Sequence, residues 1–120
     1  MNFVEDFRVP LWLFNGHLQT IWPATVGKKH LLREVRPSYF REKWKTPDHD
    51  FIEIDFNRNF YREKKPIVVL FHGLEGSSSS YYSLAFYQAC KELKFSLSIP
   101  HFRGCSGPAN KLPRSYHAGD

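Results

Sequence analysis

The stretch PIVVLFHGLEGSSSS, residues 66–80, decides the fold predicted for this chain. Residues 66–71 form an unbroken apolar run rich in β-branched side chains, which is typical of a strand buried on both faces of a sheet. The run stops at His72 and Gly73, and a turn rich in glycine and serine follows. Apolar side chains then recur at helical spacing at Tyr82, Ala85, Phe86, Ala89 and Leu93. This order predicts the first half of a βαβ unit and an α/β fold.

A turn of this kind can bind negative charge. Backbone N–H groups at the start of a helix have no partner within the helix, and the helix dipole favours an anion or a developing oxyanion there. We expect Gly73 and Gly76 to adopt backbone geometry that a Cβ atom would oppose, and Ser79 or Ser80 to cap the helix. Two interpretations remain open for the turn, a plain connector and a functional site.

Composition indicates a small globular domain with no nucleic-acid partner. The chain has 120 residues, of which 42% are hydrophobic and 24% are charged, and its net charge is +5. Residues 28–65 contain eleven Lys or Arg and seven Asp or Glu, which accounts for +4 of that excess. Because the two signs are interleaved and no nucleic-acid motif accompanies them, we interpret this segment as a solvated charged face.

Two cysteines, Cys90 and Cys105, predict a reducing compartment and no disulfide framework. Cys90 lies in the predicted helix, where we expect it to behave as a small apolar residue. Neither cysteine has metal-ligand spacing to a histidine, so no metal or other cofactor is expected. The first residues carry acids where a signal peptide carries bases, and no apolar run is long enough to cross a bilayer. We therefore expect a cytoplasmic protein.

Residues 1–45 are predicted to form an N-terminal aromatic arm. Pro10 and Pro23 argue against one continuous helix through this segment, although residues 17–20 could open a short helix after a turn at residues 15–17. An extended arm packed on the core is the favoured interpretation. The alternative is contact with a membrane surface through Trp12, Phe14 and Trp22, which the lack of clean helical periodicity disfavours.

Residues 46–120 are predicted to hold the first strands, the first crossover helix and a following loop. Residues 50–56 alternate with the period of two that is typical of a half-buried strand, and residues 57–65 resemble a hairpin loop. Residues 95–99 form a second short strand, which predicts a parallel pair with a right-handed crossover. Residues 101–108 then lie beyond the carboxyl end of that strand, where open α/β sheets bind ligands.

Four segments in order resemble a known family. They are NGHLQT at residues 15–20, HGLEGSSSS at residues 72–80, FRGCSG at residues 102–107 and YHAGD at residues 116–120. Together they resemble the YheT-like branch of the α/β-hydrolase superfamily. That branch is related to eukaryotic α/β-hydrolase-domain proteins and to yeast medium-chain ethyl ester synthase/esterases.

The resemblance implies hydrolysis or acyl transfer of carboxylic esters by a Ser-Asp/Glu-His triad, with a small-molecule ester as substrate. In such enzymes the turn after the third strand donates one oxyanion-hole N–H, which here is that of Leu74. The resemblance further assigns His72, Gly73, Glu75 and Gly76 to the supporting turn. It places the edge of the substrate pocket at His17, Arg103, Gly104, Cys105 and His117.

The nucleophile is missing from the sequence. A nucleophile elbow needs Gly-x-Ser-x-Gly, and the nearest match, Gly104-Cys105-Ser106-Gly107, has Pro108 in the final position. Cys105 as a thiol nucleophile beside His101 or His117 is disfavoured, because sequence shows no positioned base. His72 is poorly placed to be the triad base, since that histidine follows the serine and the acid in this superfamily.

We therefore expect a single partial domain, the N-terminal part of an α/β-hydrolase fold with an incomplete, mostly parallel sheet. The 120 residues alone are expected to be inactive. The alternative is a non-catalytic module that binds a phosphate or carboxylate at residues 73–80.

Overall fold

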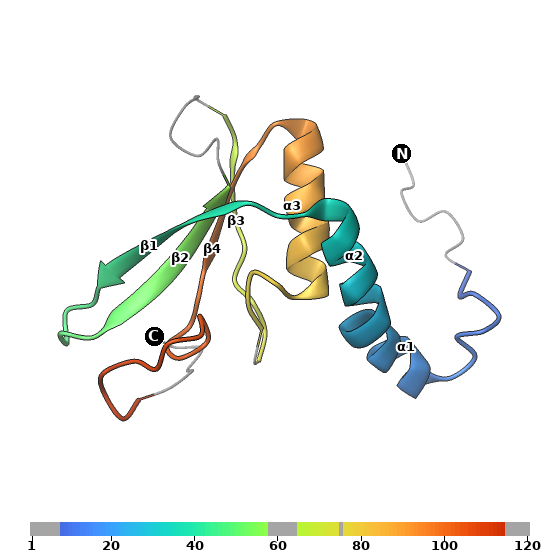
Figure 1. Ribbon diagram of the computed structural model, residues 1–120, viewed down its shortest axis with the longest axis horizontal. Helices are drawn as coiled ribbons and strands as arrows, with labels where there is room; N and C mark the ends of the chain where they lie inside the picture. The colour runs from blue at the N-terminus through green and yellow to red at the C-terminus, as the bar shows by residue number, and fades with distance from the viewer. Residues whose placement is uncertain (1–7, 58–64, 75, 115–120) are drawn as a thin grey trace.

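The computed structural model describes residues 8–57, 65–74 and 76–114. Helices and one mixed sheet make up this part of the chain (Figure 1). In chain order the elements are α1 (Gly16–Trp22), the π-helix η1 (Pro23–Gly27), α2 (Lys28–Val35), β1 (Tyr39–Lys45), β2 (Phe51–Asn57), β3 (Ile67–Val69), α3 (Tyr81–Leu93) and β4 (Ser96–Pro100).

The four described strands have the order β1-β2-β4-β3. β3 and β4 pair in parallel, which confirms the predicted crossover through α3. β1–β2 and β2–β4 are antiparallel pairs, so the open sheet of this α/β fold is mixed and not mostly parallel as expected. The reason is local, because the chain turns back between Lys45 and Phe51, where the Thr46 amide donates to the Asp50 carbonyl over 3.1 Å. A connection this short can join only antiparallel neighbours.

The burial of β2 and β3 is the reverse of what the sequence predicts. β2 was expected to be half-buried, but Glu53 and Asp55 are as buried as Ile54 and Phe56. β3 was expected to be buried on both faces, yet Ile67 and Val69 are 56% and 51% exposed. β2 has a neighbour on each side, whereas β3 pairs only with β4 among the described strands. Only Val68 of β3 packs against the core.

The hydrophobic core lies between the sheet and α3. Leu97 and Ile99 of β4 are fully buried, and Tyr87 and Cys90 of α3 pack against them with Val35 of α2. Cys90 therefore behaves as the apolar residue that the sequence predicts, and burial raises the pKa of its thiol. Neither Cys90 nor Cys105 is in a disulfide bond with a described residue.

The N-terminal arm is helical where an extended arm was expected. The short helix predicted near residue 17 is present as α1, whose N-cap Asn15 accepts a hydrogen bond from the Leu18 amide over 2.9 Å. Pro23 does not end the helical path, because a π-helical turn there accommodates a residue that lacks an N–H donor.

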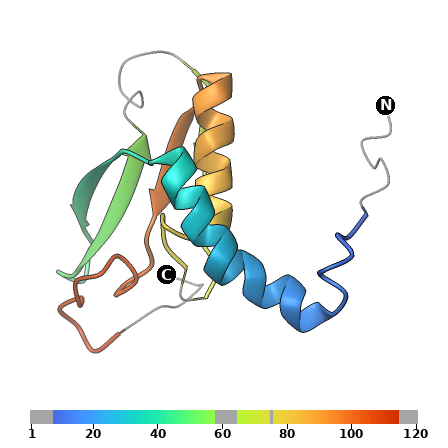
Figure 2. The same cartoon turned by 45° about the vertical axis from the view of Figure 1, so that its right-hand side comes forward.

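Within the arm, α2 and η1 both pack against α3, whereas α1 contains no buried residue. Figure 2 shows α1 leading away from the sheet while α2 crosses α3. Among the described residues, no helix is both long and apolar enough to cross a bilayer.

Candidate functional site

In the turn between β3 and α3, the Leu74 amide is a backbone donor that no described residue accepts. The Gly76 amide donates to the Gly73 carbonyl over 2.9 Å and closes the turn, while the Gly73 amide donates to the Tyr82 hydroxyl over 3.0 Å. Leu74 is 78% exposed, and its amide donates to no other described residue. These residues line a cavity of about 260 Å³ with Ala24, Lys28, Ser80, Tyr81 and Tyr82.

The two glycines of this turn differ in what they require. A Cβ at Gly76 would lie 2.9 Å from both the Gly73 carbonyl oxygen and the His72 Cβ, so this position accepts only glycine. A Cβ at Gly73 would meet no atom within 4 Å, and Gly73 has no positive φ. The expectation that both glycines adopt special geometry is therefore wrong for Gly73. Ser80 occupies the N-cap position of α3, but its hydroxyl accepts from the Ser77 amide and not from the helix.

His72 joins this turn to the loop that follows β4. Its Nε2 accepts the Phe102 amide over 3.1 Å, so the proton of the neutral ring lies on Nδ1 and donates to the Gly73 carbonyl over 2.9 Å. The ring is 3% exposed, and burial lowers its pKa. A neutral His72 thus connects the carboxyl ends of the two parallel strands.

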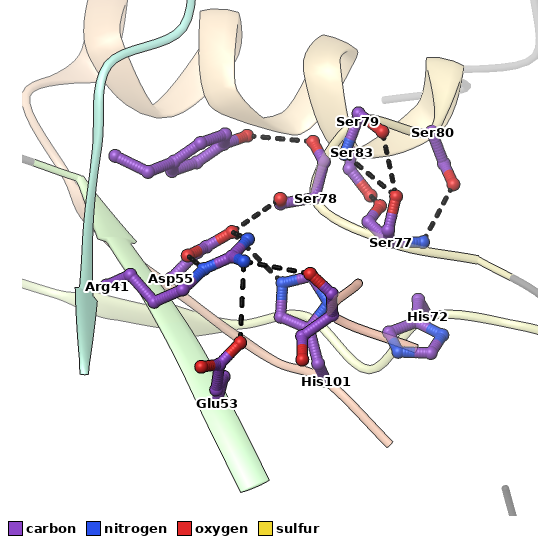
Figure 3. A network of polar contacts seen from close by, with 12 residues as sticks. Arg41, Glu53, Asp55, His72, Ser77, Ser78, Ser79, Ser80, Ser83 and His101 are labelled. Atoms are coloured by element: carbon purple, nitrogen blue, oxygen red, sulfur yellow. Dashed lines mark hydrogen bonds and ion pairs between the residues drawn. The ribbon is translucent and has the colours of Figure 1, made fainter. Parts of the chain in front are cut away.

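A buried carboxylate, that of Asp55, lies beside the turn and bonds to it through Ser78 (Figure 3). Asp55 of β2 is 1% exposed and accepts two hydrogen bonds from Arg41 of β1, at 2.6 Å and 2.8 Å. Ser78 Oγ donates to it over 2.5 Å, and His101 Nε2 lies 3.0 Å away. Burial raises the pKa of Asp55, but the hydrogen bonds from Arg41, His101 and Ser78 outweigh it and hold that pKa well below its usual range.

Further hydrogen bonds connect Ser78 and Arg41, the partners of Asp55, to other elements. The Tyr39 hydroxyl donates to the Ser78 carbonyl over 3.1 Å, and burial together with the nearby Asp55 charge raises the pKa of this phenol. Arg41 Nη1 also donates to the Ser106 carbonyl over 2.9 Å. β1, β2, the turn before α3 and the loop after β4 therefore meet at one polar layer.

A second buried carboxylate, that of Asp50, anchors the loop after β4. Arg103 lies 3.1 Å from Asp50 and 2.7 Å from Asp48, and the amides of Lys111 and Asn110 also bind Asp50. Burial raises the pKa of Asp50, but hydrogen bonds from the Lys111 backbone amide and the Asn110 side chain, together with the amides of Phe51 and Leu112, outweigh it and hold that pKa below its usual range. Arg103 also lines a second cavity of about 140 Å³ with Phe71, His101 and Phe102.

The structure brings together some of the sequence-predicted pocket residues and separates others. Gly104 has a φ of +74° in a turn that the Cys105 amide closes by donating to the Phe102 carbonyl over 2.9 Å, and the Phe102 amide in turn bonds to His72. His17 is exposed on α1, without a hydrogen bond, ion pair or ring contact to any described residue. Glu75 and His117 lie outside the described residues.

Sequence reasoning missed Asp55, Arg41, Ser78 and Tyr82. Period-two alternation placed Asp55 on the solvent face of its strand. The available signal was the hairpin register, because counting back from the turn sets Arg41 opposite Asp55. An Arg and an Asp at facing positions of one hairpin indicate a cross-strand ion pair.

Known proteins that this chain resembles share a hydrolase description. YheT of Escherichia coli (strain K12), named as an esterase, is 36% identical over 107 residues, which are 88% of this chain and 30% of that protein. An abhydrolase domain-containing protein of Dictyostelium discoideum is 30% identical over 115 residues, which are 93% of this chain and 28% of that protein. This chain is related to the α/β-hydrolases.

The chain spans about 30% of the length of the curated relatives it matches. No family model matches it. No solved structure matches it either. The mixed open sheet and the helices agree with the relationship, so the resemblance read from the four motifs is confirmed at the level of the superfamily.

The buried bond between Ser78 and Asp55 predicts a contrast between two serines of one turn. We expect Ser78→Ala to lower the free energy of unfolding by about 1.5–3 kcal/mol, because it removes a buried hydrogen bond to a charged group. Ser79→Ala is the matched control, since Ser79 bonds only to the neighbouring Ser77 within the turn. Urea denaturation measures both, and equal losses would contradict the role given to Asp55.

The lowered pKa of His72 predicts acid sensitivity. The unfolded chain binds the proton near pH 6.5 and the folded chain binds it only at lower pH, so stability is complete above about pH 6.5 and falls as the solution is acidified. We expect His72→Asn to flatten this dependence by up to about 1.4 kcal/mol per pH unit. His17→Gln, at an exposed histidine, should leave it unchanged. Denaturation between pH 7.5 and 5 measures the slopes, and parallel curves for His72→Asn and wild type would refute the assignment.

Proposed function

We propose that the turn after β3 supplies one of the two oxyanion-hole donors of a carboxylic-ester hydrolase or acyltransferase, through the N–H of Leu74. One observation carries the proposal. This amide follows a strand of the parallel pair, precedes α3, borders a cavity and donates to no other described residue. The hydrolase descriptions of the relatives support the reaction class.

The chemistry follows from where charge develops. Attack of a serine hydroxyl on an ester carbonyl places negative charge on the carbonyl oxygen, and a fixed N–H that points at this oxygen stabilises the transition state. One such donor is worth about 3 kcal/mol, and the positive end of the α3 dipole adds to it. His72 and Gly76 would keep the turn in one conformation, so that little reorganisation is needed during the reaction.

The proposed reaction also needs groups that these 120 residues do not supply. No Gly-x-Ser-x-Gly pentapeptide occurs in the sequence. In α/β-hydrolases the second oxyanion donor is the residue after the nucleophilic serine. We therefore assign the serine, acid and histidine of the triad to sequence outside these 120 residues, and expect the 120-residue chain alone to turn over no ester.

A chimera tests the role of Leu74. The chain replaces the matching region of E. coli YheT, and hydrolysis of p-nitrophenyl butyrate is measured. Leu74→Pro removes the N–H, so we expect kcat to fall roughly 100- to 1000-fold. Leu74→Ala keeps the N–H and should retain activity within about threefold of the parent chimera, which separates loss of the donor from loss of the side chain.

Two results would overturn the proposal. One is equal activity of the proline and alanine variants. The other is a chimera that folds by circular dichroism but hydrolyses no ester. The isolated 120-residue chain is the blank, and serine-dependent turnover by it would contradict the assignment of the nucleophile.

A second candidate function is a non-catalytic module that binds phosphate or a carboxylate at residues 73–80. The observation in its favour is Lys28, which lines the same cavity beside the start of α3 and makes no ion pair with a described residue. Against it, neither the Walker nor the dinucleotide-binding glycine pattern occurs in the sequence. A cation and a helix N-terminus at one cavity nevertheless favour an anion.

Thermal unfolding with inorganic phosphate or acetate separates the two functions. A specific site would stabilise the chain by about 2.7 kcal/mol at 100 times its Kd. Lys28→Gln should then abolish the shift, while Lys29→Gln, at the exposed neighbouring lysine, should keep it. The hydrolase proposal predicts no Lys28-dependent shift, so that result would remove the binding module.

We also infer a cytoplasmic location and no nucleic-acid partner. The two free thiols fit a reducing compartment. Arg41 of the basic segment 28–65 is held in an ion pair with Asp55, so this base is engaged within the domain. A pull-down with total RNA from cell extract that retained the chain at 0.2 M salt would contradict the second inference.

A further inference from the structure

An apolar surface covers the outer end of the N-terminal arm. We call it the aromatic patch, and it consists of Leu11, Trp12, Phe14, Leu18, Ile21 and Trp22. Leu11 and Phe14 are 96% and 78% exposed, and Trp12 and Ile21 are each more than half exposed. These six side chains come from residues 11–22, and apolar surface gathered in this way marks an interaction site more often than scattered single residues do.

Ring contacts and hydrogen bonds hold the residues of the aromatic patch in place. The rings of Trp12 and Trp22 meet edge to face with centroids 4.6 Å apart, which joins the loop before α1 to the helix. Gln19 Nε2 donates to the Leu13 carbonyl over 2.9 Å, and the Leu13 amide donates to the Pro10 carbonyl over 2.8 Å. Leu18, Ile21 and Trp22 follow the i, i+3, i+4 spacing that places side chains on one helix face. The structure thus supplies the periodicity that the sequence alone did not show.

Bases outnumber acids in the segment that carries the aromatic patch, although Glu5, Asp6 and Glu34 flank it in the sequence. Residues 8–33 contain four Lys or Arg and no Asp or Glu, so this segment carries +4. The four bases are Arg8, Lys28, Lys29 and Arg33, which lie on either side of the patch in the chain. Tryptophan prefers the boundary between headgroups and acyl chains, and flanking bases attract anionic headgroups.

We propose that the aromatic patch binds an anionic lipid surface. The helix lies on the membrane and does not cross it, with its apolar side chains at the boundary between headgroups and acyl chains and its bases at the phosphates. A second copy of the chain would be a poor occupant, because a symmetric pair would bring eight bases together with no acid in the segment to compensate them.

The aromatic patch is also continuous with the candidate site. Trp22 lines a cavity with Tyr81, and Tyr81 lines the Leu74 cavity as well. If the proposed ester chemistry holds, lipid binding would place that cavity at the surface where acyl esters of low solubility collect. This consequence rests on the proposed function, whereas the lipid binding itself does not.

Vesicle flotation of the purified 120-residue chain tests the proposal. We expect the chain to float with vesicles of phosphatidylcholine and phosphatidylglycerol in a 7:3 ratio, and far less with phosphatidylcholine alone. Leu11→Ser with Phe14→Ser should reduce the partition coefficient at least about tenfold, since burying one such side chain is worth that much. Phe40→Ser with Leu93→Ser, at residues 52% and 62% exposed on other elements, is the matched control and should bind as wild type does.

A second pair of variants tests the charge. Lys29→Gln with Arg33→Gln should reduce partitioning onto the anionic vesicles about 25-fold, at roughly fivefold for each base near an anionic surface. Lys91→Gln with Lys94→Gln, at the end of α3, should have little effect. Circular dichroism and thermal unfolding of each variant show whether it has folded, because all eight substituted positions are on the surface or partly exposed.

Three outcomes would overturn the proposal. They are absence from the anionic vesicles, equal flotation of the patch and control variants, and a dimer in light scattering that Leu11→Ser with Phe14→Ser dissociates. The last result would assign the aromatic patch to contact between two copies. None of these measurements depends on ester turnover, so failure here is distinct from failure of the hydrolase proposal.

Discussion

The ionised carboxylate of Asp55 is the constraint on which the rest of the structure depends. It is buried at the centre of the sheet, where an unpaired charge would cost several kcal/mol. Arg41, Ser78 and His101 satisfy it, and each comes from a different part of the chain. The position of the turn before α3 therefore follows from electrostatics as much as from apolar packing. A domain that buries such a group gains a defined geometry, because few arrangements supply all of its donors together.

The candidate site is held between this carboxylate and a neutral imidazole. Asp55 fixes the turn by accepting the Ser78 hydroxyl. His72 fixes it by bonding to the Gly73 carbonyl and to the Phe102 amide. Two loops that follow parallel strands are thereby kept at a set separation. Such preorganisation is what electrostatic catalysis requires, since donors that are already in place need not reorient as charge develops.

Sequence reasoning predicted the elements better than their surroundings. The helix α3, strands β2 and β4, the parallel pair and the glycine turn were all foreseeable, because periodicity and glycine placement are local properties. The burial of Asp55 and the exposure of Ile67 were not, since alternation shows which side chains share a face and not what covers that face. The need for glycine at position 76 was expected from the turn, whereas the bond from the Gly73 amide to the Tyr82 hydroxyl spans nine positions and could not be derived from local pattern.

The outer edge of β3 has a geometric consequence for the site. Within the described part of the chain β3 pairs only with β4, so the amides and carbonyls on its other side can accept a further strand. The apolar side chains of Ile67 and Val69 would gain cover from such a neighbour. If that strand ran parallel to β3, its own carboxyl-terminal loop would emerge beside Leu74, because parallel strands finish at a common rim. The neighbour that this three-residue strand accepts would therefore bear on which residues border the Leu74 cavity.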